Sequence, residues 1–283
     1  MRRLTFVLVL LLGVSLPAQT IGPDRGTLVI VGGAMQDPAI VKRFIELAGG
    51  PDAPIVIIPT AGDADEYDQN YSGLKQWREH GATNLTVVHT RDQKVAETEA
   101  FVKPIRAARG VFFAGGRQWR LADAYLKTLT HRALDELLAR GGVIGGSSAG
   151  ASILTSFMVR GDTKSNEKMI GDHTVGLGFL KNAAVDQHLL RRNRQFDMLA
   201  VIEQHPELLG IGLDEDTAIV VHGDQFEVIG QSYAVIYSNI PVAGASGRFF
   251  FMGAGDRFDM KTRKATRQGA EWRPLPGVRP PPN

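Results

Sequence analysis

Short apolar runs rich in β-branched residues alternate along this chain with amphipathic stretches, and this alternation constrains the fold more than any other feature. Nearly every apolar run before residue 150 ends at a glycine-rich turn, and the stretches between the runs repeat apolar residues at helical spacing. Because parallel strands need crossover connections, the pattern predicts an α/β fold whose mostly parallel sheet has helices on both faces. The expected strands are 28–31, 55–58, 85–88, 110–113 and 142–144, and the expected helices are 39–47, 71–80, 119–129 and 131–140.

Further apolar runs follow in the second half of the chain, at 210–213, 217–221 and 226–229. The last runs, 248–252 and 257–258, are more typical of antiparallel pairing. In an open α/β sheet, ligands bind in the crevice outside the carboxyl ends of the strands. We therefore expect a functional site where the glycine-rich turns follow the early strands.

The absence of cysteine excludes several classes of protein. None of the 283 residues is Cys, so the chain has no disulfide framework, no thiol nucleophile and no cysteine-ligated zinc. With 43% hydrophobic and 22% charged residues, the composition is that of a globular protein. The chain has 32 basic and 30 acidic residues. Their charges balance when Arg2 and Arg3, which lie in the export signal described below, are left out. A neutral body gives no electrostatic case for a nucleic-acid partner.

The first residues have the pattern of an export signal. Arg2-Arg3 forms a positive start, residues 4–14 form an apolar run too short to span a bilayer, and Ala18 offers a cleavage site. The mature protein is expected to be exported, free of the membrane and either periplasmic or secreted. The expected segments are a signal peptide over 1–18, a single α/β domain over 19–260 and a basic, Pro-rich tail over 261–283.

The most specific motif is Gly146-x-Ser148-x-Gly150, between an expected strand and a segment that can begin a helix. This is the spacing of a nucleophile elbow, where a strand turns so sharply into a helix that neighbouring positions must be small. The turn exposes the Ser148 hydroxyl, and the N–H of Ala149 would face an oxyanion formed there. A phosphate-binding turn or a packing turn would have similar glycines, but the Lys that a P-loop needs is missing.

A serine hydroxyl needs a base, and usually an orienting acid, to become a nucleophile. Seven histidines are available, and His188 stands at a polar entry to a basic stretch. Three consecutive acids, 214–216, follow an apolar run; they could supply the orienting carboxylate or form a solvated turn. The order Ser148, His188, Glu215 differs from that of α/β-hydrolases, for which His222 would be the base.

Several ordered motifs resemble the cyanophycinase group of serine peptidases, which are relatives of aspartyl dipeptidase. The resemblance spans roughly residues 26–260 and implies a flavodoxin-like fold similar to that of class I glutamine amidotransferases. The motifs that carry it are Gly32-Gly33-Ala34, Ile57-Ile58-Pro59-Thr60-Ala61, Phe113-Ala114-Gly115-Gly116-Arg117-Gln118, Gly146-Ser147-Ser148-Ala149-Gly150-Ala151, Asp186-Gln187-His188 with Arg192 and Arg194, and Gly212-Leu213-Asp214-Glu215-Asp216-Thr217-Ala218.

The resemblance also implies roles for individual residues. Ser148 matches the nucleophile, His188 the base and Glu215 the orienting acid, and neither a metal nor an organic cofactor is required. The N–H groups of Gly116 and Ala149 match the oxyanion hole. The residues that match the substrate-holding positions of the family are Gln118, Asp186, Gln187, Arg192 and Arg194.

The substrate that the resemblance implies is cyanophycin, a polymer of aspartate and arginine (multi-L-arginyl-poly-L-aspartate), which the family cleaves to β-Asp-Arg dipeptides. Arginines would suit it because guanidinium groups bind carboxylates through paired hydrogen bonds. Asp197 stands where cyanobacterial members carry a third Arg, so a peptidase for other aspartyl or isoaspartyl peptides is an alternative. A catalytically silent envelope binding protein is a third hypothesis. Because the family often dimerises, a homodimer is a possible assembly.

Overall fold

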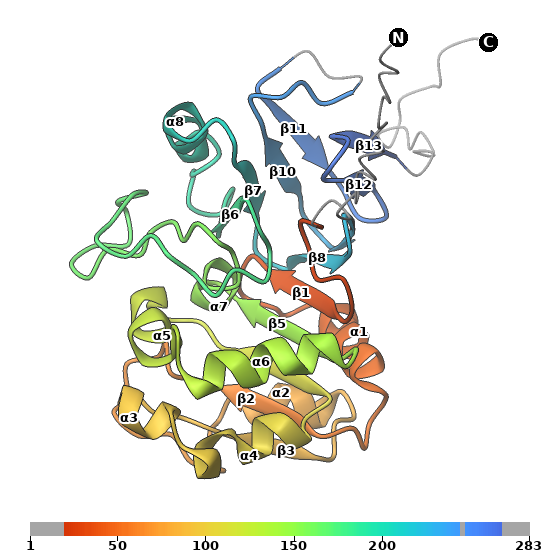
Figure 1. Ribbon diagram of the computed structural model, residues 1–283. Coiled ribbons are helices and arrows are strands. Elements are labelled where there is room, and N and C mark those ends of the chain that lie inside the picture. The colour runs from red at the N-terminus through yellow and green to blue at the C-terminus, as the bar shows by residue number, and fades with distance from the viewer. Residues whose placement is uncertain (1–19, 244–246, 268–283) are drawn as a thin grey trace, which may run out of the picture.

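Two sheets organise the protein, and the larger is built around five parallel strands (Figure 1). The computed structural model describes residues 20–243 and 247–267, so the predicted signal peptide and residues 268–283 of the predicted tail lie outside the described residues. The parallel strands, in spatial order, are β1 (Thr27–Val31), β5 (Val143–Ser147), β4 (Gly110–Phe113), β2 (Ile55–Ile58) and β3 (Leu85–Val87). Four antiparallel strands extend the sheet beyond β1, namely β8 (Thr217–His222), β9 (Gln225–Gly230), β12 (Arg257–Asp259) and β13 (Lys264–Thr266).

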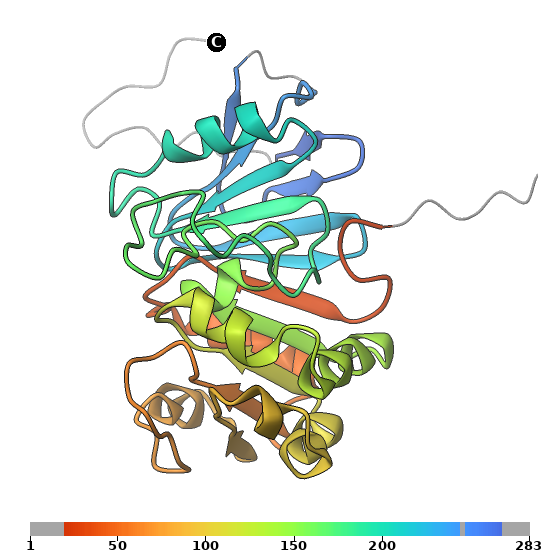
Figure 2. The same cartoon turned by 60° about the vertical axis from the view of Figure 1, so that its left-hand side comes forward.

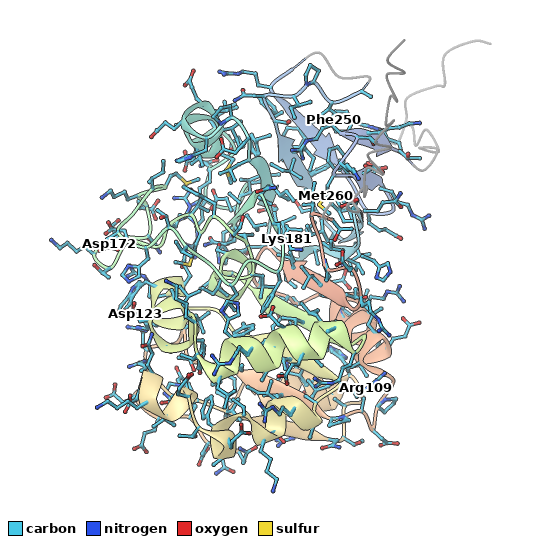
Figure 3. All side chains as sticks on the ribbon, in the orientation of Figure 1. Arg109, Asp123, Asp172, Lys181, Phe250 and Met260 are labelled. Atoms are coloured by element: carbon cyan, nitrogen blue, oxygen red, sulfur yellow. The ribbon has the colours of Figure 1, made fainter. Side chains whose placement is uncertain are left out.

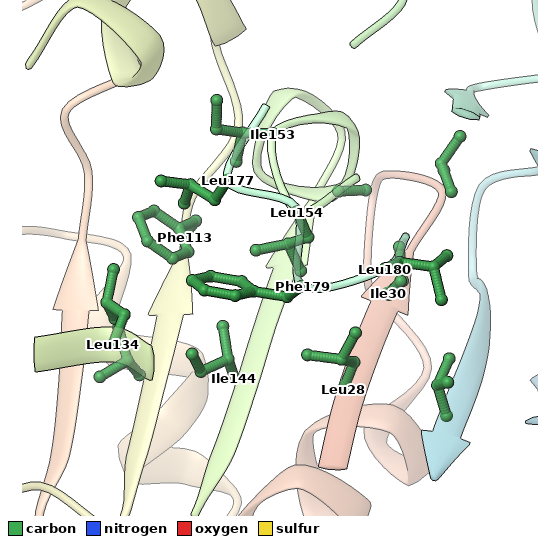
Figure 4. Close-up of a cluster of buried hydrophobic side chains, with 14 of the residues drawn as sticks. Leu28, Ile30, Phe113, Leu134, Ile144, Ile153, Leu154, Leu177, Phe179 and Leu180 are labelled. Atoms are coloured by element: carbon green, nitrogen blue, oxygen red, sulfur yellow. The ribbon is translucent and has the colours of Figure 1, made fainter. Parts of the chain in front are cut away.

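The parallel strands are continuous apolar runs because helices cover both faces of the sheet. Along β1, Leu28 and Ile30 pack into one apolar cluster while Val29 and Val31 pack into another, as the two-residue period of a strand requires. Figure 4 shows part of the first cluster, in which Leu28 lies across from Ile144 of the neighbouring strand β5 and Ile30 lies beside Leu180. The predicted α/β fold, with a parallel sheet and helices on both faces, is confirmed.

The helices divide between the two faces of the larger sheet. The Asp37 side chain caps the first turn of α1 (Pro38–Ala48) by accepting the N–H of Ala39, and Gly49 ends that helix with a φ of 112°. In the described part of the chain, none of the helices has the length and apolar character needed to cross a membrane. The helices on the Val29 face are α1 (Pro38–Ala48) and α2 (Leu74–Glu79); those on the Leu28 face are α3 (Gln93–Ala96), α4 (Glu99–Ala107), α5 (Gln118–Tyr125), α6 (Leu129–Ala139) and α7 (Ala149–Ser152).

A second, smaller sheet was not predicted as a separate unit. In spatial order its strands are β11 (Phe249–Met252), β10 (Ala234–Tyr237), β7 (Leu209–Leu213) and β6 (Ala183–Gln187), and helix α8 (Asp197–Gln204) packs against it. Figure 2 shows this blue-green and blue part of the chain above the red to green parallel strands. Strand β6 escapes prediction because it ends in Asp186 and Gln187, which are both buried here although such polar residues are uncommon in strands.

The first residues of the predicted tail, 261–267, take part in the described structure. Residues 264–266 form β13, which pairs with β12, and the N–H of Ala243 donates to the carbonyl of Arg263 at 3.0 Å. Met260, labelled in Figure 3, is buried in the main apolar cluster. A basic segment can still form an edge strand, because lysine on an edge keeps its charge in solvent and discourages further strand pairing.

A chain that ends at residue 260 should be less stable than one that ends at residue 267. The shorter chain loses the pairing of β13 with β12 and with Ala243. At about 1 kcal/mol for each net hydrogen bond, the free energy of unfolding should fall by about 2–3 kcal/mol. Urea titrations of both chains, followed by circular dichroism, measure the difference. Equal unfolding midpoints would contradict the assignment of 261–267 to the folded part of the protein.

Candidate active site

A tight turn between β5 and α7 presents Ser148 at the carboxyl edge of the larger sheet. Ser148 has φ 57° and ψ −115°, and its N–H donates to the carbonyl of Val31 at 3.1 Å. The neighbouring glycines are required by close backbone approach: a Cβ on Gly146 would lie 2.1 Å from the Gly150 carbonyl oxygen, and one on Gly150 would lie 2.1 Å from the Phe113 carbonyl oxygen. The predicted elbow after a central strand is therefore present.

His188 and Glu215 lie behind the Ser148 hydroxyl in one chain of hydrogen bonds. Ser148 Oγ is 2.8 Å from His188 Nε2, and His188 Nδ1 is 2.7 Å from Glu215 Oε1. An ionised carboxylate can only accept, so Nδ1 carries the proton and Nε2 is left to accept from the serine hydroxyl. The three side chains singled out in the sequence are thus brought together in the order that proton transfer from the serine would need.

The His188 ring is fixed from two further directions. Its backbone follows β6 with a φ of 53°, and its N–H donates to the Gly32 carbonyl at 2.8 Å. Gly33 packs directly on the imidazole: a Cβ at this position would lie 2.3 Å from Cε1 and 2.5 Å from Nδ1 of His188. Gly33 also has a φ of 138°, which favours glycine. Gly33 belongs to one of the motifs found in the sequence, but the sequence alone does not predict that it packs on the His188 ring.

The pKa of His188 lies below its ordinary value of 6.5. Burial, which penalises the charged imidazolium, is the main cause, and the positive charges of Arg192 and Arg194 add to it. The hydrogen bond to Glu215 and its negative charge act in the opposite direction but do not outweigh burial. The imidazole is therefore neutral near pH 7, which is the state in which it can accept a proton.

The three consecutive acids at the end of β7 serve three different hydrogen-bond networks. Asp214 Oδ1 accepts the N–H groups of Leu190 and Arg191 at 3.0 and 2.9 Å, which holds the turn after His188. Glu215 contacts the imidazole itself. Asp216 turns instead toward the loop after β1, where its carboxylate accepts backbone N–H groups. These three acids therefore do not form a simple solvated turn, because each carboxylate has its own hydrogen-bond partners.

The predicted oxyanion donors lie on two segments that meet at Ser148. The N–H of Ala149 is in the first turn of α7, where a helix has no internal acceptor for it. Gly115 lies against the Ser148 turn, since a Cβ there would be 3.3 Å from Ser148 Cβ. Gly116 has φ 142° and abuts the carbonyl of Ala61, which would be 2.1 Å from an added Cβ. Glycine at 116 therefore lets this loop pack tightly against the Ala61 carbonyl while the adjacent Gly115 lies beside Ser148.

Most residues predicted to hold substrate are buried in a network of charged groups. Asp186 is fully buried and binds the guanidinium of Arg160 through two hydrogen bonds of 2.7 and 2.9 Å. Arg194 is also buried and donates to the Gln187 side chain at 3.1 Å and to Glu167 at 2.9 Å. These groups support the site from beneath rather than line its surface.

The remaining substrate-holding candidates differ in exposure. The Gln118 side chain is buried and donates to the Val159 carbonyl at 2.8 Å, whereas Arg192 is exposed. Asp197, which replaces an expected arginine, accepts from Arg160 at 2.6 Å. Sequence reasoning missed Arg160 because nothing in its local pattern marks an arginine that pairs with acids 26 and 37 positions further along the chain.

His222 is not placed to act as the base of an α/β-hydrolase arrangement. Its Nδ1 is 2.8 Å from the Gly26 carbonyl oxygen, just before β1, whereas Ser148 follows the far end of the neighbouring parallel strand β5. Within residues 20–243 and 247–267, no group of three or more His, Asp or Glu side chains is arranged to hold a metal ion.

A cavity of about 160 Å³ lies beside the turn between β5 and α7, on the face of the larger sheet that α1 and α2 cover. Ser147 faces it, whereas Ser148 faces His188. The residues that line the cavity are Ala34, Met35, Ile57, Tyr71, Gly73, Gln76, Trp77, Phe112, Ala114, Gly115 and Ser147.

A parallel sheet with a Ser-His-Glu chain of hydrogen bonds at its carboxyl edge is an arrangement of the serine hydrolase class. The family model of peptidase family S51 matches residues 28–229. The chain belongs to this family and is a serine-type peptidase. It is 33% identical over 266 residues to a cyanophycinase of Geminocystis herdmanii (strain PCC 6308), covering 85% of this chain and 96% of the relative. It is 28% identical over 262 residues to a cyanophycinase of Synechococcus elongatus, covering 85% and 81%.

Solved structures agree with this assignment. The crystal structure of a peptidase from an acI-B1 actinobacterium superposes with a TM-score of 0.64 at 25% identity, over 85% of this chain and 98% of that one. A putative peptidase E from Listeria monocytogenes EGD-e superposes with a TM-score of 0.51 at 16% identity, over 73% and 99%. The second likeness supports the fold alone.

His188 and His173 should titrate on opposite sides of 6.5 in one NMR experiment. Burial disfavours the charged form of His173, but Asp172 and Asp123, both labelled in Figure 3, accept from its ring and raise its pKa. Glu215→Gln should lower the pKa of His188 further, because it removes the charge that favours imidazolium. Ring-proton shifts measured against pH give both values, with His173 as the internal reference. A His188 pKa above 6.5, or one that rises in E215Q, would contradict this account.

Proposed function

We propose that this protein is an exported serine-type exopeptidase that hydrolyses cyanophycin to β-Asp-Arg dipeptides. Ser148 is the nucleophile, His188 the general base and Glu215 the acid that orients it. The observation that carries the proposal is the continuous chain of hydrogen bonds from Ser148 Oγ to the Glu215 carboxylate. The substrate is inferred from relatives that are cyanophycinases and match most of this chain.

The proposed reaction is acyl transfer through a covalent intermediate. His188 Nε2 removes the hydroxyl proton as Ser148 Oγ attacks the carbonyl carbon of the scissile peptide bond. The N–H groups of Gly116 and Ala149 stabilise the tetrahedral oxyanion, at about 3 kcal/mol for each donor. His188 then gives the proton to the leaving amine. Water repeats the sequence on the acyl-enzyme and releases the carboxylic acid product.

The charged groups around the site suit a substrate that carries both carboxylates and guanidinium groups. Arg192 is exposed beside the base and can bind a substrate carboxylate. Glu167 and Asp197 have side chains that are 71% and 39% exposed, and each is already paired with a buried arginine. They leave carboxylate surface available to a substrate guanidinium. In this proposal Gln118, Asp186, Gln187 and Arg194 fix the shape and charge of that surface from below.

A peptidase for other aspartyl or isoaspartyl peptides is the second candidate, and Asp197 favours it. Its carboxylate binds Arg160 and leaves the site without the guanidinium that a third arginine would supply. One substrate carboxylate would then lack a partner. The silent binding protein loses its support, because the chain belongs to a peptidase family.

Ser148→Ala should lower the rate of β-Asp-Arg release from cyanophycin by a factor of about 10⁴ or more, since removal of a nucleophile costs that much in comparable triads. Ser147→Ala is the matched control, because it removes the adjacent hydroxyl, which faces away from His188. Mass spectrometry of the products measures the release. Wild-type rates in S148A would exclude Ser148. Cleavage of short Asp-X peptides in preference to cyanophycin would favour the second candidate.

Export is proposed from residues 1–18 alone. The full chain, expressed in a Gram-negative host, should yield periplasmic or secreted protein whose first residue is Gln19. Fractionation followed by N-terminal sequencing tests this, with a chain that begins at residue 19 as the control for leakage. Recovery of uncleaved protein in the cytoplasm would contradict it.

A further inference from the structure

The loop that follows β1 has an unusual backbone. Gly33, Ala34 and Met35 are consecutive residues with φ values of 138°, 55° and 54°. Two adjacent non-glycine residues in the left-handed region are uncommon and persist only where surrounding contacts impose them. The loop therefore needs an anchor outside itself.

Asp216 supplies that anchor from the end of β7. Its carboxylate accepts the N–H of Asp37 at 3.1 Å and also that of Gln36. Its own N–H donates to the Gly33 carbonyl at 3.1 Å, and its carbonyl accepts from Gln231 at 2.8 Å. One residue thus ties both ends of the 33–37 loop to the turn that carries Glu215.

The anchored 33–37 loop packs against the imidazole ring of His188. Gly33 lies so close to the His188 ring that an added Cβ would come within 3.0 Å of three ring atoms. Gly32 accepts the His188 N–H at 2.8 Å. A shift of the loop would therefore free the ring to move and would admit water to its face.

We propose that Asp216 is a positioning residue of the hydrolytic site. Its carboxylate holds the 33–37 loop against the imidazole of His188, which keeps the ring in hydrogen-bonding reach of Ser148 and shielded from water. The inference rests on the proposed roles of Ser148 and His188, and it adds a second acid of the Asp214-Glu215-Asp216 turn to the same machinery.

Loosening the loop should change the titration of His188 in a defined direction. The charges that act most strongly on the ring are Glu215, from the turn after β7, and Arg192 and Arg194, from the turn after β6. None of these changes when Asp216 is replaced. Burial is the main reason that the pKa of His188 is low, so water admitted by a loosened loop should raise the pKa toward 6.5.

The test compares Asp216→Gly with Asp216→Asn. Glycine removes the carboxylate yet tolerates the φ of 52° at this position, whereas asparagine keeps an acceptor oxygen. In D216G the pKa of His188, measured by NMR, should rise. Labelling of Ser148 by a fluorophosphonate should slow roughly ten- to a hundredfold, the cost of a misplacement of about 1 Å. D216N should recover most of both properties.

Asp259→Gly is the matched control, because Asp259 also accepts two backbone N–H groups, those of Lys261 and Thr262, but in the distant β12–β13 turn. It should leave the His188 titration and the labelling rate unchanged. Wild-type titration and labelling in D216G would overturn the inference, and so would a loss of labelling that D259G shares.

Two further measurements separate the possible failures. If wild-type Ser148 is not labelled, the proposed function fails, while the His188 titration in D216G still decides the role of Asp216. If D216G does not fold, hydrogen exchange on the wild-type protein decides it. Slow exchange of the Gln36 and Asp37 amides supports the anchor, and exchange at the rate of an open loop overturns it.

Discussion

The backbone turn at Ser148 is the constraint on which the rest of the site depends. A non-glycine residue at φ 57° and ψ −115° carries strain of order 1–3 kcal/mol, which the surrounding structure must offset. The offset comes from packing that only glycine permits, with Gly146 against Gly150 and Gly150 against the carbonyl of β4. Because β5 lies between β1 and β4, both neighbouring strands help to hold the turn. The strained residue is thereby held by close packing on both sides of its strand.

Burial and nearby charges have different effects on the imidazole of His188. Burial keeps His188 neutral, and the hydrogen bond to Glu215 fixes its tautomer. In the proposed mechanism the Glu215 carboxylate also stabilises the imidazolium that forms when His188 takes a proton. Glu215 follows β7 of the smaller sheet, and Ser148 follows β5 of the larger one. The groups of the proposed triad therefore meet where the two sheets come together. The buried Arg160 pairs with the buried Asp186 and with the partly exposed Asp197. Burying such charges is costly unless their pairing is complete.

The sequence predicts those parts of the protein that depend on local rules. The parallel strands and the elbow follow from apolar runs that end in glycine, because each run and its turn are contiguous. Strand β6 could not be predicted in this way, since Asp186 is tolerated in a buried strand only because the distant Arg160 pairs with it. Strand β13 could not be predicted for a related reason: a basic composition gives no sign that residues 264–266 pair with β12. The role of Gly33 depends on a ring that lies 155 positions further along the chain, so no local pattern reports it.

The most direct test of the central claim is peptide mapping of the protein after reaction with a fluorophosphonate. The account predicts a single phosphonyl adduct on the Ser148 hydroxyl, with none on Ser147, and predicts that His188→Ala prevents its formation because no other group accepts the serine proton. An unmodified Ser148 in the wild-type protein, or equal modification in the wild-type and H188A proteins, would contradict the account.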